Sequence, residues 1–208
     1  MSNLKMLTNK FKFNYSIGAV ANGIKTDTFT FFLLFFYSNI IGLNPGLAGL
    51  AILIALCVDA VTDPLMGTIS DRTNTKYGRR HPFMMISFIP MSIGYILLFA
   101  PRQDWDMTQN DLFLWMTLFT ILTRIGMTLF DIPHRAFGGE VTKNYEERTL
   151  LMSWREMMGW VAGLSNAFLG YGIFFASTPE YPRGQFNLML GPIWHDWSHI
   201  MIISVLYS

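Results

Sequence analysis

The sequence has very little cysteine and little charge. Cys57 is the only cysteine among 208 residues, so the chain can form neither an internal disulfide nor a cysteine-based metal site. Charged residues make up 14% of the chain, against about 25% in ordinary soluble domains, whereas 51% of the residues are hydrophobic. The net charge is +1 and no nucleic-acid-binding motif is evident, so nothing supports a nucleic-acid partner. This composition indicates an all-α membrane protein whose surroundings are the lipid bilayer.

The hydrophobic residues form blocks that are long enough to cross a membrane as helices, which takes about 20 residues. We predict five spans and the start of a sixth: residues 17–43, 47–69, 82–100, 112–133, 150–176 and 200–208. The last block is too short to cross roughly 30 Å of hydrocarbon. We therefore expect the chain to be cut inside a sixth helix, and the alternative is a short tail at the membrane interface.

Positive charge gathers on one side of these predicted spans. Lysine and arginine are frequent before the first span and in residues 70–81 and 138–149, whereas the opposite side carries only Arg102 and Arg183. Loops rich in lysine and arginine remain in the cytoplasm. We therefore predict a multi-pass protein of the cell (inner) membrane with its N-terminus in the cytoplasm.

Two aspartates lie inside the otherwise uncharged block at 47–69. A carboxylate at membrane depth costs about 2.5–3.5 kcal/mol on insertion scales. Asp59 and Asp63 are four residues apart, so a helix places them on one face. Carboxylate oxygens suit hard cations, and together with Asp131 these residues are candidate ligands of Na⁺, Li⁺ or a proton. The alternative is simple pairing with arginines, and the two interpretations are compatible if an ion and an arginine exchange. The candidate arginines are Arg124, Arg135 and Arg155.

Other polar and aromatic residues have weaker interpretations. Arg124 and Asp131 share a helix face, and Arg155 can bind a sugar hydroxyl or an acid through its planar guanidinium, although structural pairing is equally open. We expect a local hydrogen bond for His134 rather than a metal site. We expect three glutamates to be solvated or capping groups: Glu140, Glu146 and Glu147. Aromatic residues of the first span can stack on a sugar ring, but packing between helices is the commoner role: Tyr15, Phe29, Phe31 and Tyr37.

Two separated motifs resemble one transporter family. The first reads DAVTDPLMG at residues 59–67, followed by SDRT at 70–73 and GRRHP at 78–82. The second reads DIP at 131–133, followed by GEVT at 139–142 and YEERT at 145–149, and then Arg155. In this order they resemble the glycoside–pentoside–hexuronide:cation symporters of the major facilitator superfamily.

The resemblance implies a fold and a function. The fold would be the six-helix N-terminal bundle of a twelve-helix transporter, with the C-terminal half missing from this sequence. The function would be cation-coupled symport of a sugar or glycoside, with no cofactor besides Na⁺, Li⁺ or H⁺. Asp59, Asp63 and Asp131 would bind the cation, Asp131 would also contact the substrate, and Arg155 would line the sugar pocket.

The resemblance also implies a cytoplasmic gate that joins the two halves through charge pairs in the outward-open state. Its residues would be Gly67, Asp71, Arg72, Gly78, Arg79 and Arg80. One departure concerns Gly23, which stands where melibiose-transporting members carry a sugar-binding acid. Asp27, one turn further on, can take over that role.

Two alternatives to sugar symport remain open. Lipid-carrying relatives share the gate motif, so the same fold can carry a lipid or another non-sugar solute. A remote alternative is an intramembrane aspartyl protease that uses Asp63 and Asp131, although the Gly-x-Gly-Asp element of such enzymes is missing.

Overall fold

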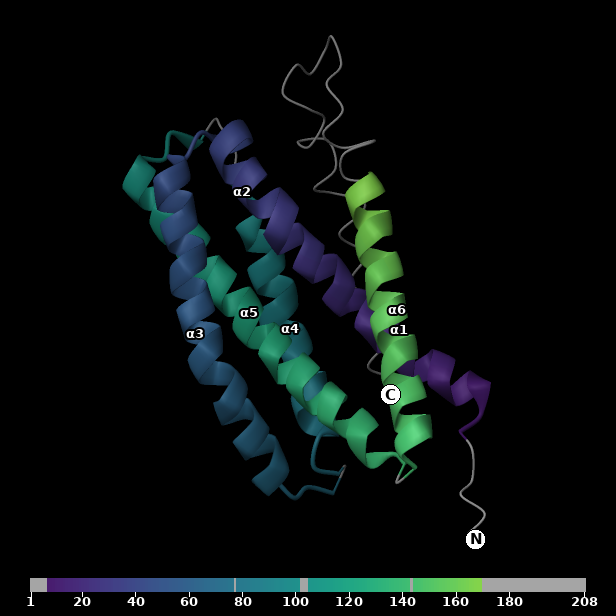
Figure 1. Cartoon of the computed structure of the whole chain (residues 1–208). Coiled ribbons are helices and arrows are strands. Elements are labelled where there is room, and N and C mark those ends of the chain that lie inside the picture. Colours follow the sequence, from purple (N-terminus) through teal and green to yellow (C-terminus); the bar gives the residue numbers. More distant parts are fainter. Residues whose placement is uncertain (1–6, 77, 102–104, 143, 170–208) are drawn as a thin grey trace, which may run out of the picture.

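A computed structural model describes residues 7–76, 78–101, 105–142 and 144–169 (Figure 1). The described elements are α1 (Asn9–Asp27), η1 (Thr28–Phe32), α2 (Leu33–Phe35), η2 (Phe36–Ile41), α3 (Pro45–Arg72), α4 (His81–Leu98), α5 (Gln109–Glu140) and α6 (Tyr145–Leu169). Three of the described helices, α3, α4 and α5, are long and apolar enough to cross a membrane. The predicted block at 200–208 and the end of the predicted span at 150–176 lie outside the described residues.

The first four elements follow one another without a break, and η1 and η2 are stretches of wider, π-helical turns. This run ends at Gly42, whose φ of 90° is a left-handed conformation that glycine adopts without strain. The next helix begins at once, because the Asn44 side chain accepts a hydrogen bond of 2.8 Å from the Gly46 N–H and Pro45 occupies the first turn.

The helix α5 is longer than the block at 112–133 from which it was predicted. It begins with a capping box in which Thr108 and Asp111 bond reciprocally, and it continues through Pro133 to Glu140. Membrane helices tolerate an internal proline when neighbouring groups satisfy the freed backbone carbonyl. The basic segment at 138–149 is therefore largely helical, since α5 reaches Glu140 and α6 begins at Tyr145.

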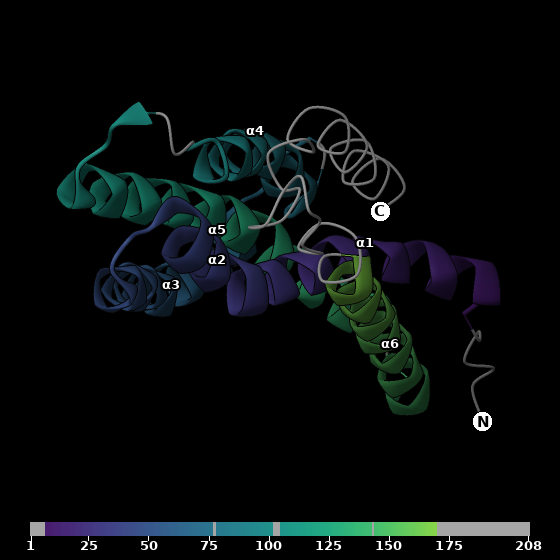
Figure 2. The ribbon, with the colours of Figure 1, turned by 90° about the horizontal axis from the view of Figure 1, so that it is seen from above.

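The helices α3 and α5 pack against each other and run in the same direction, inclined to one another (Figures 1 and 2). Residue 59 meets residue 124 and residue 63 meets residue 128, and both pairs are 65 positions apart in the sequence. A Cβ placed on Gly67 would lie 3.8 Å from Ile132, one turn further along. A single seam therefore joins three successive turns of the two helices.

In two other helix pairs, α4 with α5 and α1 with α6, glycines allow the backbones to approach closely. Gly126 of α5 leaves so little space that an added Cβ would lie 2.7 Å from the Met91 nitrogen of α4. At the crossing of α1 and α6, a Cβ on Gly23 would overlap the Gly159 carbonyl oxygen. Small residues allow such approaches in membrane bundles, where dispersion contacts drive helix association.

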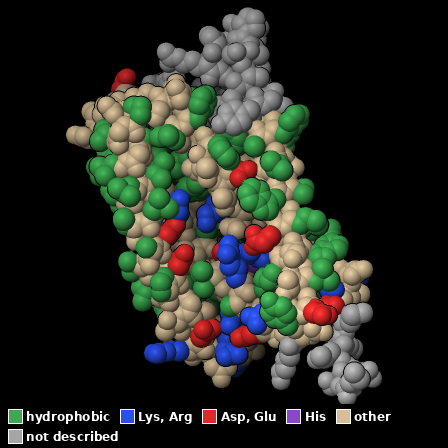
Figure 3. Space-filling view, in the orientation of Figure 1, with side chains coloured by type: hydrophobic (Ala, Val, Ile, Leu, Met, Phe, Trp, Pro, Cys, Tyr) green, Lys and Arg blue, Asp and Glu red, His purple; other side chains and the backbone are tan. Residues whose placement is uncertain are grey.

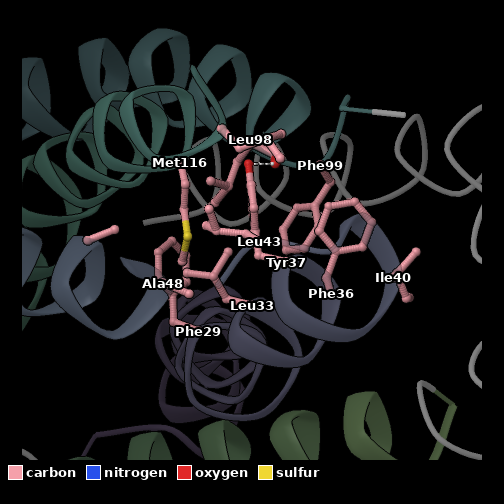
Figure 4. Close-up of a cluster of buried hydrophobic side chains, with 12 residues drawn as sticks. Phe29, Leu33, Phe36, Tyr37, Ile40, Leu43, Ala48, Leu98, Phe99 and Met116 are labelled. Carbon is pink, nitrogen blue, oxygen red and sulfur yellow. Dashed lines mark hydrogen bonds between the residues drawn. The ribbon is translucent and has the colours of Figure 1, made fainter. Parts of the chain in front are cut away.

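The hydrophobic core lies at the end of the bundle where α2 and η2 meet α3, α4 and α5 (Figure 4). Phe36, Tyr37 and Phe99 are buried there, and the Tyr37 hydroxyl donates a hydrogen bond of 2.7 Å to the Leu98 carbonyl. Gln109 ties the same end together by bonding the Gly42 carbonyl and the Asn44 N–H. Tyr37 is therefore a packing residue.

Candidate ion and substrate site

The seam between α3 and α5 holds the two aspartates predicted to bind a cation. Asp59 forms an ion pair with Arg124 of α5, and their side chains are 20% and 11% exposed. One turn further on, Asp63 accepts a hydrogen bond of 2.7 Å from the Thr128 hydroxyl. The same seam thus gives one carboxylate a charged partner and the other a neutral partner.

The opposite side of α3 presents hydrocarbon to its surroundings. Large hydrophobic side chains of this helix are about half exposed: Leu50, Leu53, Leu56, Val61, Leu65 and Ile69. Asp59 and Asp63 point away from them and toward α5. Charged side chains gather down the middle of the face in Figure 3, between hydrophobic flanks. The polar groups therefore lie on an inner face of the bundle and the lipid-facing surface is apolar.

The Arg124 guanidinium has a second contact. Its carbon lies 5.0 Å from the centre of the Phe29 ring, which comes from η1. A cation above an aromatic face is attracted by the ring quadrupole. The Asp59 Oδ1 atom and the Arg124 Nε atom are buried without a hydrogen-bond partner among the described residues.

Asp131 belongs to a separate cluster between α5 and α6. Its oxygens lie 2.6 Å from Arg155 and 2.6 Å from Arg135, and Arg155 also bonds Glu156 at 2.6 Å. The Arg155 side chain is only 2% exposed, whereas that of Arg135 is half exposed. Arg155 therefore reaches the inner face from α6, where its planar group can hold a carboxylate or a polar ligand.

The three candidate ion ligands do not gather around one point. Asp59, Asp63 and Asp131 each have different partners, and in the described parts of the chain no three acidic, histidine or cysteine side chains are close enough to hold a metal ion together. The structure shows the arginine pairing that the sequence also predicted, in which arginines neutralise Asp59 and Asp131. Asp63 alone of the three bonds to a hydroxyl.

The place of a sugar-binding acid on the first helix is closed in this protein. Gly23 packs directly on the Gly159 backbone, so no side chain fits there. One turn further along, the Asp27 carboxylate lies over Gly163, where a Cβ would approach its Oδ2 atom to 2.6 Å. The glycine of α6 leaves room for the carboxylate of α1, and Asp27 therefore reaches the inner surface between these helices.

The predicted gate residues gather at one end of the bundle. The Arg80 Nη2 atom lies 3.0 Å from Asp71 and 2.7 Å from Glu140, so this arginine joins the ends of α3 and α5. Arg79 lies 3.6 Å from the same Glu140 oxygen. Gly78 has a φ of 93°, which favours glycine in this turn. Arg72 is exposed, and Gly67 faces Ile132 across the seam.

The sequence profile of the family described as MFS/sugar transport protein matches residues 14–203. The chain belongs to this family. Its all-helical membrane fold and its resemblance to the glycoside–pentoside–hexuronide:cation symporters are thereby confirmed.

Similar members of this MFS/sugar transport family carry symporter names. The inner membrane symporter YicJ of Escherichia coli (strain K12) is 30% identical over 79% of this chain and 35% of its own length. The putative glycoside/cation symporter YagG of the same organism is 33% identical over 78% and 35%. The sodium-dependent lysophosphatidylcholine symporter 1-A of Danio rerio is 30% identical over 84% and 32%. The chain thus spans about a third of the length of the curated relatives it matches.

Two gate-end glutamates, expected to be solvated or capping groups, form ion pairs; Glu140 is still exposed, whereas Glu147 is buried. Glu140 pairs with Arg79 and Arg80, and Glu147 is a buried partner of Lys12 at 2.9 Å that also accepts the Leu7 N–H. Their partners are 60 and more residues away in the sequence, so local charge patterns could not reveal them.

The structure adds detail at two buried positions, His134 and Lys25, the second of which the sequence analysis did not single out. His134 is fully buried between Tyr15 and Phe130, whose rings stack on it at 4.5 and 5.2 Å, and neither ring nitrogen has a hydrogen-bond partner among the described residues. The His134 carbonyl accepts a hydrogen bond of 3.0 Å from the Tyr15 hydroxyl, and ring stacking surrounds its imidazole. Lys25 of α1 lies within electrostatic range of Asp59, Asp63 and Asp131. A single lysine within a predicted span was the signal that could have placed it in the site.

Proposed function

We propose that the complete protein is a cation-coupled symporter of a sugar or glycoside. The observation that carries this proposal is the placement of Asp59 and Asp63 on the inner face of α3, against polar groups of α5. Charged groups at membrane depth are costly and usually mark ion or substrate pathways. The relatives named as symporters, one of them putatively for glycosides and cations, support the same function.

In this proposal, the cation acts by removing unpaired negative charge. A carboxylate on the inner face resists closure of the transporter around its substrate while it remains charged and without a compensating ion. Binding of a cation at Asp59 or Asp63 neutralises that charge and favours the occluded state by its differential affinity for the two conformations. Asp131 would link cation binding to substrate binding, because it contacts Arg155 on the adjoining inner face of α6.

The substrate would lie between α1, α5 and α6. Arg155 and Asp131 offer a donor and an acceptor there, Asp27 offers a second acceptor, and Arg124 borders the same face from α5. Sugar hydroxyl groups are recognised by such charged donors and acceptors. Since Gly23 admits no side chain, we propose that Asp27 takes the role of the sugar-binding acid.

The charged residues at the gate end of the bundle indicate how the protein is oriented in the membrane. The N-terminal segment meets α6 through Lys12 and Glu147, and the ends of α3 and α5 meet through Arg80 (Figure 1). The three basic segments of the sequence therefore share one end of the bundle. We propose that this end faces the cytoplasm, as the excess of lysine and arginine predicts.

A lipid substrate is the second candidate. The similarity to a relative named as a sodium-dependent lysophosphatidylcholine symporter favours it. The protease hypothesis lacks such support, because Asp63 bonds Thr128 while Asp131 bonds Arg135 and Arg155, so the two acids do not share a proton.

The test is uptake by the full-length protein in proteoliposomes, with a panel of radiolabelled glycosides and with lysophosphatidylcholine. Each substrate is offered under an inward gradient of Na⁺, Li⁺ or H⁺. We expect accumulation of a glycoside above its external concentration with one of these gradients, and loss of that accumulation in Asp59→Asn and Asp63→Asn with normal membrane insertion. Cation-driven accumulation of lysophosphatidylcholine alone would select the second candidate, and accumulation of nothing in the panel would contradict both.

A further inference from the structure

Lys25 of α1 is a charged residue of the inner face that the proposed transport mechanism does not use. It lies inside a predicted span and is partly buried. Arg124 and Arg155 of the same face each form an ion pair with an aspartate, whereas Lys25 forms no ion pair with any described residue. Charged groups at membrane depth are costly and usually mark ion or substrate pathways. The role of Lys25 therefore depends on what lies opposite its side chain.

The side chain of Lys25 lies on the face of α1 that meets α5. On this face the Tyr15 hydroxyl donates a hydrogen bond of 3.0 Å to the His134 carbonyl. Further along, the Phe29 ring centre lies 5.0 Å from the guanidinium carbon of Arg124. Residues three and four positions apart share one face of a helix. Such steps lead from Tyr15 to Phe29 through Lys25, along positions 15, 18, 22, 25 and 29.

The position of Lys25 along α5 follows from the same helix contacts. These contacts occur in reverse order along the two helices: residue 18 with residue 134, and residue 29 with residue 124. Lys25 therefore lies level with Thr128, whose hydroxyl bonds Asp63. Its ammonium group is within electrostatic range of Asp63. Because arginines pair with the other two aspartates of the inner face, Asp63 is the carboxylate whose charge Lys25 balances.

Cation binding would change the electrostatic balance around Lys25. In the proposed symport, the coupling cation binds at Asp59 and Asp63. It cancels the negative charge opposite Lys25 and adds a second positive charge to the same inner face. Like charges repel strongly where water is scarce, so the ammonium then needs a new negative partner. A negatively charged substrate supplies that partner, and cation and substrate would each raise the protein's affinity for the other.

We propose that Lys25 binds a negatively charged group of the substrate, and that the transported glycoside carries a carboxylate, as glycosides of uronic acids do. The inference rests on the proposed symport function and names its substrate class. A carboxylate brings one negative charge, which matches the single charge of Na⁺, Li⁺ or H⁺, whereas a phosphate monoester brings about 1.5 to 2. The ammonium donates up to three charge-assisted hydrogen bonds to such a group. Asp27, Asp131 and Arg155 remain for the sugar hydroxyl groups.

The test is uptake by the full-length protein in proteoliposomes under an inward gradient of Na⁺, Li⁺ or H⁺. The substrates are matched pairs of methyl glycosides: glucuronide with glucoside, galacturonide with galactoside, and mannuronide with mannoside. The two members of a pair differ in one group, which is a carboxylate in the uronide and a hydroxymethyl group in its neutral counterpart. Wild-type protein should transport one uronide with a KM at least about tenfold below that of the neutral counterpart.

Variants of Lys25 show whether its charge is the source of this preference. Lys25→Gln should raise the KM for the uronide at least about tenfold and change the KM for the neutral counterpart by less than about twofold. Lys25→Arg retains the positive charge and should retain the preference for the uronide. Lys10→Gln is the matched control, since it removes an exposed lysine of the same helix and should change neither KM.

Two results would overturn the inference. One is transport of a neutral glycoside by the wild-type protein with a KM equal to or below that of the matching uronide, a comparison that needs no variant. The other is a Lys25→Gln protein that keeps the wild-type preference for the uronide. Failure of the symport proposal looks different, because then neither member of any pair accumulates under any of the gradients.

Discussion

At the scale of single residues, glycines set how closely α1 can approach α6. Gly23 has no space for a side chain, because an added Cβ would overlap the Gly159 carbonyl. We expect Gly23→Ala to lower the free energy of unfolding by about 1–3 kcal/mol through overpacking. The measurement is thermal unfolding in detergent. Gly49→Ala is the matched control, since nothing lies within 4 Å of its added Cβ and helix propensity favours alanine. Equal melting temperatures of Gly23→Ala and wild type would contradict the packing described here.

Glu147 connects the start of α6 to the N-terminal segment. Hydrogen bonds from the Lys12 ammonium and the Leu7 N–H hold the pKa of Glu147 below its usual 4.5. Because the pKa is lower in the folded state, this carboxylate stabilises the fold fully above about pH 4.5 and loses that contribution as the pH falls through its folded value.

The corresponding experiment compares wild type with Glu147→Gln in thermal unfolding between pH 3 and pH 8. The melting-temperature difference should be constant near neutral pH and should shrink toward zero in acid. Glu146→Gln, an exposed neighbour in the same turn, should show no such difference. A Glu147→Gln deficit that persists unchanged at pH 3 would show that the charge is not its source.

Residue roles were predictable from the sequence only where the chemistry is local. Two carboxylates on one helix face at membrane depth identified the inner face of α3, and the arginines proposed as alternative partners of Asp59 and Asp131 are the ones found. The aromatic pocket of His134 and the burial of Glu147 depend on helices far apart in the sequence. No periodicity within one segment carries that information.

At the scale of elements, a capping box at its N-terminus fixes where α5 begins. The Thr108 hydroxyl and the Asp111 carboxylate bond each other's backbone N–H groups, at 3.3 and 3.1 Å. This capping box satisfies two donors that the first helical turn leaves open. The hydroxyl of Thr108 also donates to Asp111, which lowers the pKa of that carboxyl.

Thr108→Ala should therefore lower the free energy of unfolding by about 1 kcal/mol. Chemical unfolding in mixed micelles measures this difference. Thr117→Ala is the matched control, because the Thr117 hydroxyl only bonds back to the Phe113 carbonyl inside the same helix, and its loss should be close to neutral. If both variants lose the same stability, the cap does not stabilise α5.

Element types were predictable because long apolar blocks admit only helices in a bilayer. The residues at which the helices begin and end were not predictable from the sequence. The predicted span ended at residue 133, whereas α5 continues through Pro133 to Glu140, and α3 begins at Pro45 rather than at the predicted residue 47. Pro45 lies in the first turn of α3, where its missing N–H costs little.

At the scale of the whole molecule, one end of the bundle is closed by hydrophobic packing and the other by charge. Arg80 is the centre of the charged end, since its buried guanidinium joins Asp71 of α3 to Glu140 of α5. Breaking a buried pair by removing one partner leaves the others uncompensated. The ends of these helices should then separate more easily.

We expect Arg80→Gln to raise the labelling rate of a cysteine introduced at Thr73, in a Cys57→Ser background, by at least about fivefold, which corresponds to roughly 1 kcal/mol of lost closure energy. The reagent is a membrane-impermeant maleimide applied to the gate end. Arg72→Gln, the exposed arginine of the same segment, is the control and should leave the rate unchanged. Unchanged labelling in Arg80→Gln would contradict a gate held by these pairs.

The account depends most on Asp63, the inner-face carboxylate that bonds a hydroxyl and has no arginine partner in the seam. The direct measurement compares two assays of one transported substrate in proteoliposomes: accumulation driven by a cation gradient, and exchange without any gradient. Asp63→Asn should abolish accumulation and retain exchange, because the amide cannot take up the coupling cation while the substrate groups remain in place. Accumulation by Asp63→Asn at the wild-type level under the same gradient would contradict the central claim.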